Sequence, residues 1–137
     1  MTWSGGLQFD TSGNLLVTGA GAAGGSSPTF TSAVTDTPGT SQNNYAPPGW
    51  VAGTTNALKL TPSANINITG LGAAPDGWTV SIDNNSTTFT LTFTDEDASS
   101  AAANQFACPG QVANTLGPRA SALIRYDGTL SKWRFLS

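Results

Sequence analysis

The densest group of ionisable side chains in the sequence is the run Asp95-Glu96-Asp97. Consecutive carboxylates at the end of a strand can supply the oxygen ligands that calcium prefers. The run lacks the Asp-x-Asp-x-Asp-Gly spacing of a calcium loop, and a solvated turn accounts for it equally well. We therefore predict no metal site at this run.

Two further strings imitate functional motifs. Gly19–Gly24 matches G-x-G-x-x-G, which binds a pyrophosphate only where the glycines open a helix, and Ser26-Ser27-Pro28 follows instead. Asp10–Gly13 resembles the Asp-Thr-Gly of aspartic proteases, but an extra residue spoils the spacing and no second copy supplies the partner carboxylate. We predict a flexible Gly/Ala hinge and a turn, and no bound cofactor.

The composition excludes several kinds of protein. The 137 residues include no histidine and one cysteine, Cys108, so no histidine-based triad, histidine-ligated zinc site or intrachain disulfide can form. Cys108 is predicted to be a small buried side chain. Five cations against eight carboxylates give a net charge of -3, too few cations for a nucleic-acid surface, and no apolar run is long enough to span a membrane. We predict a non-enzyme without catalytic residues, nucleic-acid partner or membrane partner.

Four tryptophans could stack on sugars in a binding module. Trp78 and Trp133 alternate with apolar neighbours and are predicted to lie in the core. Trp50 follows Pro47-Pro48-Gly49, which places it at a surface or a subunit contact.

The elements that must position these residues are predicted to be strands. Ile66 and Ile68, then Trp78 to Ile82, then Phe89 to Phe93 alternate apolar residues with Thr, Ser, Asn or Asp. Residues 84–87 are typical of a hairpin turn, and Asp127-Gly128-Thr129 separates a final strand pair, residues 122–126 and 132–136. The sequence predicts an all-β protein, a β-sandwich or jelly-roll-like domain.

A change of composition near Asn56 predicts two parts. Residues 1–56 hold most of the glycines and only two charges, and they are predicted to form an extended low-complexity N-terminal arm with short β pieces at residues 7–9 and 15–18. Residues 57–137 are predicted to form the β-domain. Because such a domain is small, association with other copies would add burial.

From Ile66 onward, about half of the chain resembles the small C-terminal β-domain of tailed-bacteriophage structural proteins, as found in tail fibres, head fibres and capsid decorations. The resemblance departs from the family pattern at Gln105, where a basic residue is common, and at Arg119-Ala120, where Pro-Gly is usual. The stretches that carry it are residues 66–71, 76–84, 90–93, 101–106, 116–128 and 132–134.

The resemblance implies a β-sandwich or jelly-roll-like homotrimer in a virion, without catalysis. The predicted function is a trimeric capsid decoration (cement) or head-fibre protein whose arm binds the major capsid protein or another virion protein. The predicted assembly contacts are Trp3, Leu7, Phe9, Phe30 and Trp50. The alternative is a short tail fibre or receptor-binding module that recognises a host surface glycan.

Overall fold

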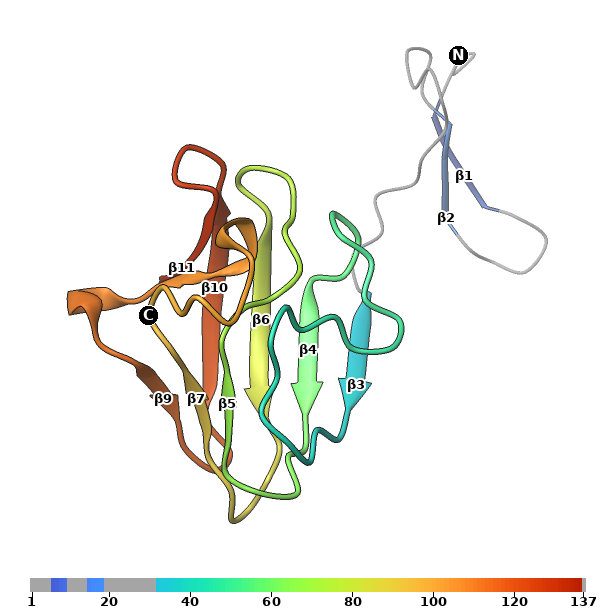
Figure 1. Ribbon diagram of the computed structural model, residues 1–137. Coiled ribbons are helices and arrows are strands. Elements are labelled where there is room, and N and C mark those ends of the chain that lie inside the picture. Colours follow the sequence, from blue (N-terminus) through green and yellow to red (C-terminus); the bar gives the residue numbers. More distant parts are fainter. Residues whose placement is uncertain (1–5, 10–14, 19–31, 137) are drawn as a thin grey trace. The chain divides into compact units, whose positions relative to one another are not determined.

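The protein is all-β. The computed structural model describes residues 6–9, 15–18 and 32–136 of the chain (Figure 1). Contacts divide the chain into two compact units, Met1–Phe30 and Thr31–Ser137. The first unit contains strands β1 (Gly6–Phe9) and β2 (Leu15–Thr18), which pair antiparallel with Leu7 opposite Val17. This agrees with the two short β pieces predicted there.

The second unit contains two sheets. The larger has the order β3-β4-β6-β10-β11-β8, and the smaller has the order β5-β7-β9. The strands of the larger sheet are β3 (Ala33–Asp36), β4 (Ala57–Leu60), β6 (Thr79–Asn84), β8 (Phe106–Ala107), β10 (Ser121–Asp127) and β11 (Lys132–Phe135). Those of the smaller sheet are β5 (Ile66–Ile68), β7 (Leu91–Phe93) and β9 (Asn114–Leu116).

The chain winds back and forth between the two sheets. Strands β3, β4 and β6 run parallel, with Ala33 beside Ala57 and Ala57 beside Ser81. The segments between them run through the smaller sheet, where β5 pairs parallel with β7 and Gln42 forms a bridge to Ile68. This β-solenoid-like winding carries the chain repeatedly from one sheet to the other (Figure 1).

The winding corrects the hairpin predicted at residues 84–87. Strand β6 belongs to the larger sheet and β7 to the smaller one, so the segment between them crosses from one sheet to the other. The predicted final hairpin is confirmed, because β10 pairs antiparallel with β11 around residues 128–131.

The domain boundary also differs from the one predicted between residues 56 and 57. It lies between Phe30 and Thr31, because β3 is a strand of the larger sheet and Tyr45 is a core residue. Residues 32–56 therefore belong to the β unit. Their scarcity of apolar residues hid this from sequence reasoning, since Val34 and Tyr45 are the only residues of this segment in the buried hydrophobic core.

The core lies between the two sheets. Phe93 of the smaller sheet contacts both Phe106 and Phe135 of the larger sheet, with ring centroids 5.3 Å apart in each pair. Trp133, fully buried as predicted, donates from its indole to the carbonyl of Leu71. The only helices in the described ranges are two single 3₁₀ turns, η1 (Ala102–Asn104) and η2 (Pro109–Gln111), and no helix there could cross a membrane.

Candidate interaction surface

The acidic run at residues 95–97 forms a structured turn. The Asp95 carboxylate accepts a hydrogen bond from the Cys108 amide at 2.6 Å, and Asp97 accepts one from the Ser99 amide at 2.8 Å. The Ser99 hydrogen bonds lower the pKa of Asp97, so this carboxylate is charged at neutral pH. Within residues 6–9, 15–18 and 32–136, no cluster of three His, Cys, Asp or Glu side chains is arranged to hold a metal.

Cys108 is buried, as its sequence context predicted. Burial raises the pKa of Cys108 to about 11, and the nearby Asp95 charge acts in the same direction. A thiol of this kind is protonated at neutral pH and a poor nucleophile.

The predicted assembly contacts fall in different places. Trp3 and Phe30 lie outside the described residues, and Leu7 and Phe9 lie in β1. Trp50 is half-buried, and its ring packs edge-on against Trp133 with centroids 6.2 Å apart. Part of the Trp50 indole is thus used within its own unit, and only the remaining part is open to a neighbour.

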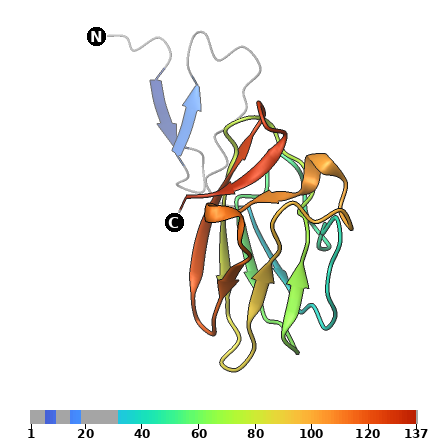
Figure 2. The same cartoon turned by 60° about the vertical axis from the view of Figure 1, so that its left-hand side comes forward.

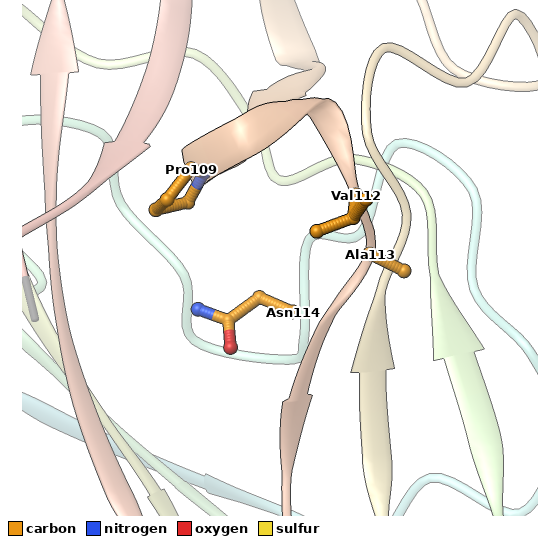
Figure 3. Close-up of a pocket in the computed structure, with 4 residues that line it drawn as sticks. All are labelled: Pro109, Val112, Ala113 and Asn114. Carbon is orange, nitrogen blue, oxygen red and sulfur yellow. The ribbon is translucent and has the colours of Figure 1, made fainter.

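A shallow hollow of about 240 Å³ lies beside η2 and the start of β9. It is lined by Pro109, Val112, Ala113 and Asn114, and the Asn114 amide projects beside Pro109 (Figure 3). One amide and no ionisable group line this hollow, so the lining can offer hydrogen bonds but no acid–base chemistry.

The outer face of the larger sheet carries the most distinctive surface. In β10 and β11 the buried residues alternate with exposed ones, and Leu123 and Leu136 keep 39% and 45% of their surface exposed. Leu123 lies beside Ser81 on one side, and its carbonyl accepts a hydrogen bond from the Leu136 amide on the other. The row continues through Ala57 to Ala33, so a weakly polar strip crosses the sheet.

Four of the five cations gather on this outer face. By strand alternation Lys59, Arg125, Lys132 and Arg134 all point to the side opposite the core. The strands of this face contribute the carboxylates of Asp83 and Asp127, and the Glu96 carboxylate reaches to 4.0 Å from Lys132 at the β8 edge. The rest of residues 32–136 carries five carboxylates and one cation, Arg119.

Two of these cations are direct neighbours. Arg125 of β10 lies opposite Arg134 of β11 in the antiparallel register. Arg134 forms an exposed ion pair with Asp127 at 3.4 Å, whereas no carboxylate of the described residues lies within ion-pair distance of Arg125. Two residues along the chain from these arginines, Leu123 and Leu136 also lie opposite each other. Leu123, Arg125, Arg134 and Leu136 together are called the Leu/Arg block, which lies on the red strands β10 and β11 and just past the end of β11 (Figure 2).

Sequence reasoning treated the five cations as scattered and missed this block. The sequence did contain a sign that these cations share the outer face, because cations alternate with core residues: Lys132 and Arg134 flank Trp133. The sequence indicated that β10 and β11 pair, but it offered no sign that β4 lies in the same sheet.

Comparison with known proteins finds no matching family model, curated protein or solved structure.

Proposed function

We propose that the protein is a non-enzymatic structural component of a tailed-phage virion, a trimeric capsid decoration or head-fibre protein. The observation that carries the proposal is the exposed Leu/Arg block on the outer face of the larger sheet. Arginine and apolar side chains are enriched at the centres of protein interfaces. Several carboxylates accept hydrogen bonds from backbone amides in turns, as Asp97 and Asp127 do, which suits a structural role.

The two sheets of the β unit would act as a rigid β-sandwich that projects from the particle. Contacts between Phe93 and Phe135 across the two sheets support this arrangement. A sandwich with a small core gains stability by joining sister copies.

The N-terminal unit would attach the protein to the shell. It precedes the β unit as a separate compact part, which suits a segment that binds the major capsid protein or another virion protein. Trp3, Leu7, Phe9 and Phe30 would enter grooves on that partner, and many symmetry-related copies would convert weak contacts into stable attachment.

The test is the composition of purified virions of the phage that encodes the chain. Quantitative mass spectrometry and immunogold labelling should find the protein on the head in tens to hundreds of copies. Absence from purified particles would overturn the proposal.

The alternative, a short tail fibre or glycan-binding module, rests on the hollow at Pro109 and Asn114. It would be favoured by a handful of copies at the tail, together with binding to a glycan array that Asn114→Ala abolishes.

A further inference from the structure

We propose that the Leu/Arg block is the contact between copies of this chain, and that it docks the acidic turn at residues 95–97 of a neighbouring copy. Copies would then assemble head to tail into a closed ring. This inference rests on the proposed trimer and specifies which surfaces build it.

The first argument is the arginine pair itself. Like charges directly opposite each other on neighbouring strands destabilise a sheet. Arg125 has no carboxylate partner in the described part of its own chain, and Arg134 has only the exposed Asp127. The isolated fold therefore gains nothing from this pair, whereas a carboxylate supplied by another molecule would neutralise it.

The second argument is the uneven distribution of charge. On the outer face, the strands of the larger sheet carry four cations and two carboxylates, while the rest of residues 32–136 carries five carboxylates and one cation. Two copies related by a twofold axis through the Leu/Arg block would bring arginines against arginines. Electrostatic complementarity favours a contact between the basic face of one copy and the acidic side of the next.

A contact between two different surfaces is heterologous, and such contacts form closed rings when the rotation between copies closes. A trimer is a ring of this kind. The charge distribution therefore favours the trimer over a twofold dimer centred on the Leu/Arg block.

The third argument is the acidic turn. Its ends are held by hydrogen bonds from the Cys108 and Ser99 amides, so little conformational freedom is lost when it docks. Between these anchors the Glu96 side chain is 56% exposed, and its carboxylate reaches only to 4.0 Å from Lys132. It remains available to a guanidinium of another copy.

Leu123 and Leu136 supply the apolar part of the contact. They lie two residues from the two arginines and on the same face, so a carboxylate bound there would be flanked by side chains that exclude water. Exclusion of water strengthens a charge pair at the centre of an interface.

The experiment measures the oligomeric state of the full chain by light scattering and analytical ultracentrifugation across a concentration series. The wild-type chain should be a trimer that weakens as salt is raised. Arg125→Glu should raise the concentration needed for assembly by about 30-fold or more. Arg119→Glu makes the same charge change at an exposed turn residue before β10, outside the Leu/Arg block, and should leave assembly unchanged.

A charge-reversal double variant and a measurement of monomer stability show whether a loss of assembly comes from the interface. Adding Glu96→Lys to Arg125→Glu restores opposite charges across the contact and should recover assembly. Because Arg125→Glu places a carboxylate beside Arg134, it should leave the thermal stability of the monomer unchanged or slightly higher. Loss of assembly with a stable monomer then reports an interface and not a folding defect.

The inference is overturned if the wild type is monomeric at all concentrations, if Arg125→Glu assembles like Arg119→Glu, or if the double variant is not rescued. None of these results depends on where the protein is found. Detection on virions with assembly insensitive to Arg125 would leave the proposed function standing, and absence from virions would remove that function whatever the interface.

Discussion

Asn84 connects the two sheets through its side chain. It is buried at the end of β6, and its amide nitrogen donates to the carbonyls of Phe89, Leu116 and Gly117 at 2.9 to 3.0 Å. Its amide oxygen accepts a hydrogen bond from the Ser86 backbone. The Asn84 side chain thus holds the segment that crosses between the sheets after β6 to the end of β9 and the residue that follows it.

Asn84→Asp should reduce the free energy of unfolding by about 3 kcal/mol or more, because a carboxylate would face three carbonyls without a hydrogen to donate. Urea unfolding at neutral pH measures the loss. The exposed neighbour provides the control, and Asn85→Asp should change stability by less than about 0.5 kcal/mol. Equal effects of the two changes would contradict this role for Asn84.

Tyr45 anchors the segment after β3 to the core. Its hydroxyl donates to the Asp36 carboxylate, and its ring is buried. Burial, reinforced by the hydrogen bond to Asp36 and by the Asp36 charge, raises the pKa of Tyr45 well above its usual value. The folded state therefore holds this proton more tightly than the unfolded chain does.

The stability of the protein should fall as the pH rises through about 10, where tyrosines of the unfolded chain begin to ionise. Between pH 9 and 11 the wild type should lose about 1.4 kcal/mol more than Tyr45→Phe, which has no proton to release at this site. Urea unfolding of both proteins across this range measures the difference. Parallel curves would show that the Tyr45 proton contributes nothing.

At the level of the elements, the two sheets are joined where β5 ends and β8 begins. Gly70 forms a bridge to Gln105, and a side-chain carbon at Gly70 would lie 2.6 Å from the Ser100 side chain and 2.8 Å from the Asn104 carbonyl. Ser100 is in turn bonded to Thr69 at 2.7 Å. The close approach of two backbones requires glycine at this junction.

Gly70→Ala should lower the melting temperature by several degrees, corresponding to about 2 kcal/mol, because the Asn104 backbone would have to move. Gly117→Ala is the matched control, since an added carbon there meets nothing within 4 Å. Thermal unfolding followed by circular dichroism compares the two. A tolerated Gly70→Ala would mean that the junction is looser than the structure indicates.

At the level of the whole molecule, the boundary between the units decides what can be removed. Every described core residue lies between Val34 and Phe135. A chain that begins at residue 31 keeps β3, Tyr45 and Trp50 with the sheets they contact. A chain that begins at residue 57 loses all three.

Deletion of residues 1–30 should therefore leave cooperative unfolding with a melting temperature within a few degrees of the full chain. Deletion of residues 1–56 should abolish it, because it exposes the edge of β4 and removes Val34 and Tyr45 from the core. Differential scanning calorimetry distinguishes the two chains. If both melted alike, the boundary first predicted at residue 56 would be the better one.

Local patterns predicted a good part of this architecture. Alternation of apolar and polar residues identified the β5, β6, β7, β10 and β11 regions and placed Trp133 in the core. Turn chemistry identified the loop after β10, where the Asp127 carboxylate accepts from the Thr129 and Leu130 amides. These features were readable because each depends on residues within a few positions of one another.

Which strands become neighbours was not readable in this way. Backbone hydrogen bonds between strands do not depend on which side chains are present, so one alternating pattern is compatible with many pairings. The crossing from β6 to β7 resembles a hairpin turn in sequence, and β3 has only one buried apolar residue. Long-range packing set these pairings, and through them it brought Lys59, Arg125, Lys132 and Arg134 onto one face of a chain whose net charge is negative.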